Sequence, residues 1–296
     1  MKKYQSRIIL FLAALFAFTG ISFGAHARAD ESSSVITTTT YSPNLGMDWN
    51  YDVYLPKGYQ AQANRKYPVL YMLHGVYGDH TNMLEKFDSQ KMLDDVIQKS
   101  GKPMIVVFVD GFNSFYVDQK GGQQMETAIV RDLIPTIEHR YKVSRRVSQH
   151  AIGGISMGGY GAARLALKYP QLFSQAAMMS PSVWYNLSKD SPLRQNLHAF
   201  TDGRTNWSDR VYASLFPTRY MNFRSRNVKL YVESTSSDDT VPIRDVQRFV
   251  RTAKRRGIAT KFVQDSGDNH NWTYWGKIAP QTYQWVNDQM DQETWH

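Results

Sequence analysis

The stretch AIGGISMGGYGAARLALK, residues 151–168, joins an apolar run, a serine between glycines and a segment with helical character. Gly154 and Gly158 each stand two positions from Ser156. Only glycine fits around a serine at so sharp a turn from strand to helix, and the turn lifts the hydroxyl out of the sheet. The helix that follows aims its first N–H groups at the same point. The pattern predicts a nucleophilic Ser156 rather than a plain glycine-rich turn.

The rest of the chain alternates short apolar runs with longer periodic ones, which indicates strands alternating with helices. We expect a mostly parallel central sheet with helices on both faces, and an antiparallel edge formed by the first two strands. The expected strands are residues 36–41, 49–55, 69–73, 104–109, 151–155, 175–179, 229–232 and 261–263. The expected helices are residues 89–99, 126–141 with a kink at Pro135, 159–168, 243–256 and 278–290.

Residues 183–227 interrupt this alternation, because they contain no clear strand and carry eight scattered aromatic residues. An excursion of this length is usually functional or forms helices of its own. We expect an insertion over the carboxyl edge of the sheet, placed before the strand at 229–232. About half of its aromatic side chains should pack a small core, and the others should line a cleft.

A serine hydroxyl needs a base to remove its proton. In folds that carry the serine at such a strand-to-helix turn, an acid and then a histidine follow the serine along the chain. Two histidines follow the insertion, His270 and His296. His270 comes just after the last expected strand, whereas His296 ends the chain. His270 is therefore the predicted base.

Two neighbouring aspartates, Asp238 and Asp239, follow the strand at 229–232. We favour Asp238 as the acid that orients His270, because it lies nearer the end of the strand. Asp239 is expected to cap the helix that begins at Ile243.

Two backbone N–H groups are expected to stabilise an oxyanion: that of Met157, which follows the serine, and that of Val76, in the loop after the strand at 69–73. His74 is expected to support this loop rather than to act as a base. Tyr77, Trp184 and Trp272 are the predicted substrate contacts, and Trp275 could help Trp272 to close one side of the cleft.

The first residues have the order of a secretory signal: Lys2, Lys3 and Arg7, then an apolar run over residues 8–23, then small residues up to Ala29. We expect residues 1–29 to be removed and residues 30–296 to form a single catalytic domain. The alternative is an uncleaved membrane anchor, which the shortness of the run disfavours. We expect no membrane span in the mature chain.

The formal net charge of +9 falls to +5 without residues 1–29, which hold four basic and no acidic side chains. Such a charge favours an anionic cell wall or polymer. The sequence has no dense stripe of Lys and Arg, so we expect no nucleic-acid partner. The chain has no cysteine, which excludes disulfides, thiolate metal sites and a cysteine nucleophile.

Residues 73–75, 154–162 and 267–275 resemble the corresponding motifs of the putative-esterase family. That family includes feruloyl, acetyl-xylan and tributyrin esterases, S-formylglutathione hydrolases and mycolyltransferases. The resemblance spans roughly residues 51–285. It implies an α/β-hydrolase fold, hydrolysis of acyl esters without a metal or organic cofactor, and a triad of Ser156, Asp238 and His270.

The sequence departs from the family in three places. The leader argues against the cytosolic formylglutathione branch. The loop at 75–80 resembles the feruloyl and tributyrin members more than the mycolyltransferases. Thr235 replaces the usual glycine in the acid loop, which keeps both Asp238 and Asp239 open as the acid.

The sequence thus predicts a secreted serine carboxylic-ester hydrolase, released or associated with the cell wall. Its expected substrates are short-chain or aromatic esters of feruloyl or acetyl type, either small or linked to a polysaccharide. One alternative is a cell-wall acyltransferase of the mycolyltransferase type. The other is a non-catalytic surface protein that uses the same fold for binding. The sequence gives no oligomeric state.

Overall fold

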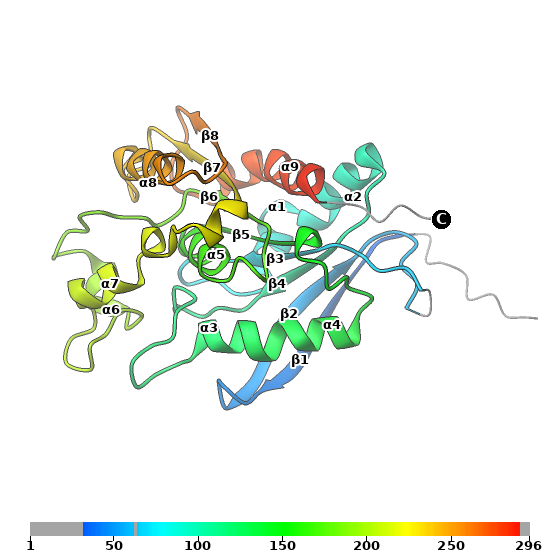
Figure 1. Cartoon of the computed structure of the whole chain (residues 1–296), viewed down its shortest axis with the longest axis horizontal. Coiled ribbons are helices and arrows are strands. Elements are labelled where there is room, and N and C mark those ends of the chain that lie inside the picture. The colour runs from blue at the N-terminus through cyan, green and yellow to red at the C-terminus, as the bar shows by residue number, and fades with distance from the viewer. Residues whose placement is uncertain (1–31, 62–63, 291–296) are drawn as a thin grey trace, which may run out of the picture.

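A computed structural model describes residues 32–61 and 64–290 of the chain. The predicted leader at 1–29 and His296 lie outside the described residues. Figure 1 shows a layered molecule in which one twisted sheet separates two sets of helices.

The described part of the chain forms an eight-stranded sheet in the order β1-β2-β4-β3-β5-β6-β7-β8. The first two strands form an antiparallel hairpin, β2 is antiparallel to β4, and all other neighbours are parallel. The eight expected strands are confirmed. Their bounds are β1 (Ser34–Ser42), β2 (Met47–Leu55), β3 (Val69–Leu73), β4 (Ile105–Val109), β5 (His150–Ile155), β6 (Gln175–Met179), β7 (Lys229–Thr235) and β8 (Thr260–Asp265).

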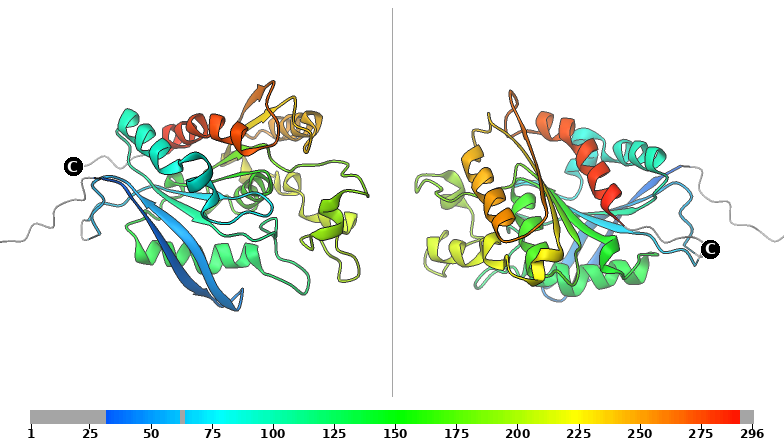
Figure 2. Two further views of the ribbon diagram at one scale, coloured as in Figure 1. Left: turned by 180° about the vertical axis from the view of Figure 1, so that it is seen from behind. Right: turned by 45° about the horizontal axis from the view of Figure 1, so that its top comes forward.

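The central strands are buried on both faces, which explains why they are continuous apolar runs in the sequence. In β3 the side chains alternate between two cores: Tyr71 joins one and Met72 the other. The first core lies under α3 (Met125–Ala128), α4 (Ile134–Arg140), α5 (Met157–Lys168) and α8 (Ile243–Arg255); the second lies under α1 (Asn82–Phe87), α2 (Ser89–Ser100) and α9 (Trp272–Gln289). Figure 2 shows α8 and α9 on opposite sides of β7 and β8.

Two helices differ from expectation in physically informative ways. A π-helical turn at Ile129–Leu133 joins α3 to α4, directly before Pro135. Proline lacks an N–H and crowds the preceding turn, and a wider turn accommodates this. The expected start of the last helix at Ile278 is wrong: α9 begins at Trp272, because the side chain of Asn271 caps it by accepting a hydrogen bond from the nitrogen of Tyr274.

The insertion is partly helical, as expected, with α6 (Pro192–Asn196), α7 (Asp209–Leu215) and two short 3₁₀ turns, Pro217–Tyr220 and Arg224–Asn227. Five of its aromatic side chains are buried and stack on Phe115 and Tyr160 of the main body: Trp184, Phe200, Trp207, Tyr212 and Phe216.

Two side chains of α5 fix the end of α7. The Tyr160 hydroxyl and the Arg164 guanidinium both donate to the carbonyl oxygen of Leu215, at 2.9 and 3.0 Å. The buried Arg164 also pairs with Glu126. The insertion is therefore anchored on the helix that follows Ser156. Among the helices of the described residues, none has the length and apolar character needed to cross a bilayer.

Candidate active site

Ser156 occupies the sharp turn between β5 and α5, with φ 53° and ψ −115°. A non-glycine residue with positive φ is strained and persists only where its surroundings enforce it. The neighbouring glycines allow the turn, because a Cβ atom on Gly158 would overlap the carbonyl group of Leu73, and one on Gly154 would overlap the backbone of Gly158. The Ser156 nitrogen donates to the carbonyl of Met179 at 2.9 Å, which fixes the turn to β6.

His270 and Asp238 extend from the Ser156 hydroxyl in one hydrogen-bonded chain. The Nε2 atom of His270 lies 2.7 Å from Ser156 Oγ, and its Nδ1 atom lies 2.8 Å from Asp238 Oδ2. The side chain of Asp238 is fully buried, and its other oxygen accepts hydrogen bonds from the nitrogens of Thr240 and Val241 at 2.9 and 2.7 Å. These bonds hold the carboxylate in the orientation that aligns the imidazole with the serine.

Asp239 does not cap α8, so that expectation is wrong. Pro242 is the residue before the helix, and no side chain caps it; Asp239 stands too far upstream. Instead, Asp239 and Asn269 pair reciprocally: Asn269 Nδ2 donates to Asp239 Oδ2 at 2.7 Å, and the Asp239 nitrogen donates to Asn269 Oδ1 at 3.0 Å. The Asn269 hydrogen bond lowers the pKa of Asp239. Asp239 thus links the acid loop to the loop that carries His270.

The loop after β3 approaches Ser156 from the other side. A Cβ atom on Gly75 would lie 3.5 Å from that of Ser156. His74 is buried and bridges this loop to the next: its Nδ1 lies 2.7 Å from the carbonyl oxygen of Gly75, and its Nε2 lies 2.8 Å from the nitrogen of Gly111. Because Nε2 must accept from that N–H, the proton of a neutral His74 is on Nδ1. His74 therefore supports the loop, as its position in the sequence indicated.

A second histidine fixes the far end of the same loop. His80 Nδ1 lies 2.8 Å from Asp52 Oδ2, on β2. The hydrogen bond to Asp52 raises the pKa of His80, against the effect of burial. The loop that carries the predicted oxyanion donor Val76 is thus held at both ends.

A pocket of about 170 Å³ opens at Ser156. Two of the predicted substrate contacts, Trp184 and Trp272, line it, whereas the side chain of Tyr77 is 67% exposed and lies outside the lining. Its other lining residues are Gly75, Val76, Leu193, Thr240, His270 and Trp275. From the insertion only Trp184 and Leu193 reach this pocket, so its aromatic wall comes from Trp184, Trp272 and Trp275.

Three residues at the site were not predicted: Ser182, Leu193 and Thr240. The hydroxyl of Ser182 lies 3.1 Å from Ser156 Oγ, and its nitrogen donates to the carbonyl of Ser156 at 3.0 Å. Ser182 follows β6, and its position at the carboxyl edge of the sheet was a signal that could have indicated it. Leu193 and Thr240 gave no comparable signal. Across residues 32–61 and 64–290, no cluster of three or more His, Asp or Glu side chains could hold a metal ion.

The parallel sheet, the serine at the strand–helix turn and its histidine and aspartate partners define the class of protein as an α/β-hydrolase. A model of the family described as "Putative esterase" matches residues 42–286. The chain belongs to this esterase family, as the sequence resemblance indicated.

Individual relatives agree with this membership. An acetyl esterase of Caldicellulosiruptor saccharolyticus is 25% identical over 238 residues, covering 75% of this chain and 84% of the relative. An endo-1,4-β-xylanase/feruloyl esterase of Xylanibacter ruminicola is 28% identical over 166 residues, covering 53% of this chain and 23% of the relative. The chain spans less than a third of the length of the first curated relatives that it matches.

The fold is shared with solved structures. That of a ferulic acid esterase superposes with a TM-score of 0.75 at 24% identity, and covers 88% of this chain and 99% of the other.

Proposed function

We propose that this chain is a serine carboxylic-ester hydrolase that works through an acyl-enzyme on short-chain or aromatic esters. The observation that carries the proposal is the continuous hydrogen-bonded chain from Ser156 Oγ through His270 to the buried Asp238, at 2.7 and 2.8 Å. The strained turn places the hydroxyl at the pocket, and the pocket admits a small acyl group.

In the acylation step, Ser156 Oγ attacks the ester carbonyl carbon while His270 Nε2 takes the hydroxyl proton. The negative oxygen of the tetrahedral intermediate accepts hydrogen bonds from the N–H groups of Met157 and Val76. The intermediate then collapses: the bond from carbon to the alcohol oxygen breaks, His270 returns its proton to that oxygen, and the alcohol leaves. Asp238 stabilises the imidazolium that exists between the two transfers.

In the second step, His270 takes a proton from a water molecule whose oxygen attacks the acyl carbon. Collapse of this intermediate breaks the bond to Ser156 Oγ, which recovers the proton from His270, and the carboxylic acid is released. When Ser156 Oγ donates its proton to His270, the Ser182 hydroxyl, 3.1 Å away, is left to donate to Ser156 Oγ and can hold that oxygen in position.

The substrate class is supported by the pocket. A volume of about 170 Å³ is below the range of roughly 300–1,000 Å³ that is typical of drug-sized ligands, so a long acyl chain has little room. Trp184, Trp272 and Trp275 give the pocket an aromatic lining, and Trp272, the most exposed of the three, can contact a feruloyl-type ring. The acetyl and feruloyl activities named for the relatives fit this size. Export, which rests on the leader alone, would place the enzyme where polysaccharide-linked esters are found.

A panel of chromogenic acetyl, butyryl, feruloyl and palmitoyl esters tests the proposal. We expect acetyl, butyryl or feruloyl esters to have the highest kcat/KM, and palmitoyl the lowest. A clear preference for palmitoyl would contradict it. Transfer of the acyl group to an added sugar in place of water would instead favour the acyltransferase alternative.

A further inference from the structure

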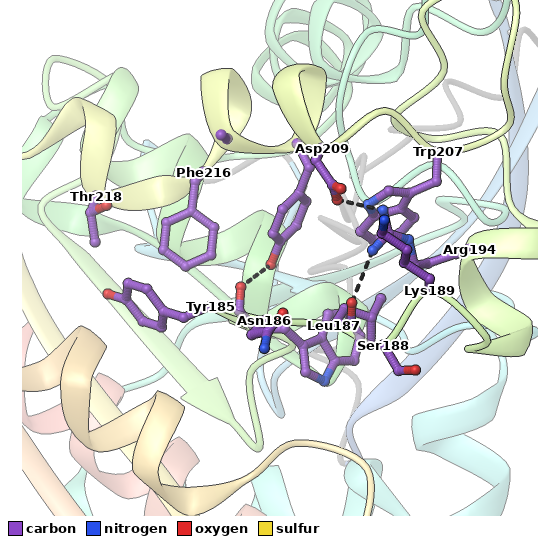
Figure 3. A pocket seen from close by; sticks show the side chains of 13 residues that line it. Tyr185, Asn186, Leu187, Ser188, Lys189, Arg194, Trp207, Asp209, Phe216 and Thr218 are labelled. Carbon is purple, nitrogen blue, oxygen red and sulfur yellow. Dashed lines mark hydrogen bonds and ion pairs between the residues drawn. The ribbon is translucent and has the colours of Figure 1, made fainter.

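The insertion holds a second pocket, of about 420 Å³ (Figure 3). It adjoins the pocket at Ser156, because Trp184 lines both. Helix α6 is shared in the same way: Leu193 lines the first pocket and the next residue, Arg194, lines the second. The Tyr212 hydroxyl donates to the carbonyl of Trp184 at 2.8 Å, which fixes this wall between the two pockets. The two pockets are therefore neighbours on either side of Trp184.

The walls of this second pocket are aromatic. Tyr185, Trp207, Tyr212 and Phe216 line it together with Trp184. Their rings pack on one another, with centroids 5.0 Å apart for Trp207 and Tyr212 and for Tyr185 and Phe216. Such packing holds the rings rigidly, so the pocket presents flat apolar faces whose positions are already fixed before a ligand arrives.

Polar groups complete the lining. Arg194 donates to the carbonyl of Leu187 at 2.9 Å and pairs with Asp209 Oδ1 at 2.5 Å, and Figure 3 shows both contacts. The Asp209 side chain is 67% exposed, so it can still accept hydrogen bonds. Within the described part of the chain, the buried indole nitrogen of Trp207 has no acceptor. Asn186 and Lys189 add exposed amide and ammonium groups.

This combination narrows the ligand class. A lipid chain would bury the Arg194–Asp209 pair without replacing the water around it, which is unfavourable. A phosphate is disfavoured because the negative carboxylate of Asp209 would repel it. A sugar ring has C–H faces that can stack on aromatic rings and hydroxyls that both donate and accept. We propose that the second pocket binds a sugar ring of the alcohol portion of the substrate, one or more units away from the ester at Ser156. The inference rests on the proposed esterase function and adds a subsite to it.

The experiment compares one acyl group carried on xylotetraose with the same acyl group as its methyl ester, using the full chain and the best acyl group from the ester panel. We expect the wild type to favour the tetrasaccharide ester in kcat/KM by about tenfold, mainly through KM. Asp209→Asn and Lys189→Ala should each reduce this ratio by about three- to tenfold, the effect of one typical hydrogen bond, and leave the methyl ester unchanged. Asp190→Asn is the matched control, because Asp190 is exposed on the same loop but does not line the pocket.

Trp207→Phe removes the unpartnered N–H while keeping an aromatic ring, and it should also lower the ratio. Equal hydrolysis of both esters by the wild type, or a ratio that none of the three variants changes, would overturn the proposal. A parallel loss on both esters would overturn it too, because the pocket would then serve the acyl group or the fold. Failure of the esterase assignment is distinct, since it would abolish serine labelling and hydrolysis of the methyl ester.

Discussion

The turn at Ser156 and the insertion at 183–227 are built by different kinds of packing. Around Ser156, backbone meets backbone: glycines let α5 approach β3 so closely that a single added carbon would overlap the carbonyl group of Leu73. In the insertion, large aromatic side chains fill the space between short helices and pack against Tyr160 of α5. The first kind of packing fixes reacting atoms closely, and the second shapes pockets that substitutions can change. We therefore expect changes near the turn to act on kcat, and changes in the insertion to act on substrate choice.

Apart from loss of the nucleophile itself, the largest effect should come from the acid. Asp238→Asn should lower kcat by about 10⁴-fold, as expected when the orienting carboxylate of a triad becomes an amide, with the fold intact. Asp239→Asn is the matched control. It weakens only the pair with Asn269, so kcat should fall by less than about tenfold. Steady-state kinetics on an acetyl ester distinguish the two, and the reverse order of effects would move the acid to Asp239.

The turn itself should tolerate no added carbon. Gly158→Ala should destabilise the protein by about 3 kcal/mol or more, because its Cβ atom would overlap the carbonyl of Leu73 and force the backbone apart. The matched control is Gly58→Ala, where nothing lies within 4 Å of the added carbon. Its positive φ should cost only about 1 kcal/mol. Urea unfolding measures both; equal costs would contradict the close approach.

Stability should fall as the pH rises through the range set by Glu233, a buried residue on the strand that leads to Asp238. Burial is the main cause that raises the pKa of Glu233, to about 7 from 4.5. The native state therefore retains a proton that the unfolded chain loses. The stabilisation is complete below pH 4.5 and is lost by about pH 7, a change of up to about 3 kcal/mol. Glu233→Gln should flatten this part of the pH profile of urea unfolding, and an unchanged profile would exclude Glu233 as its cause.

The smallest effect should come from the wall between the pockets. Trp184→Leu should lower kcat/KM for feruloyl esters about fivefold more than for acetyl esters, since one aromatic contact contributes about 1 kcal/mol. Phe223→Leu is the control, because Phe223 belongs to the same insertion but is 73% exposed and lines neither pocket. A loss that is equal for both esters would mean that Trp184 supports the fold rather than substrate choice.

The contrast between the two regions also explains what the sequence could predict. Buried parallel strands are apolar runs in the sequence, so the strands of the sheet could be predicted. The glycines around Ser156 are required by sterics, so the serine could be predicted too, and Asp238 and His270 then followed from their places after the later strands. The early start of α9 was missed because its cap, Asn271, directly follows His270 in what looked like a loop. The true role of Asp239 was missed because it depends on Asn269, thirty residues away.

The insertion was less predictable for the same physical reason. Eight aromatic residues indicate a packed unit but not which rings face which space. Only the folded structure assigns Trp184 to both pockets, places Trp207 and Tyr212 in the second, and leaves Phe223 exposed. Contacts made by side chains from separate short segments have no pattern along the sequence.

The central claim, that Ser156 is the nucleophile, is tested most directly by labelling with a serine-directed phosphonate, followed by intact mass and peptide mapping. The account predicts one adduct, on Ser156, together with loss of ester hydrolysis. Ser156→Ala should take up no label and should lose about 10⁶-fold in kcat, whereas Ser214→Ala, an exposed position on α7, should behave as the wild type. Labelling at another residue, or a Ser156→Ala variant that retains activity, would contradict the account.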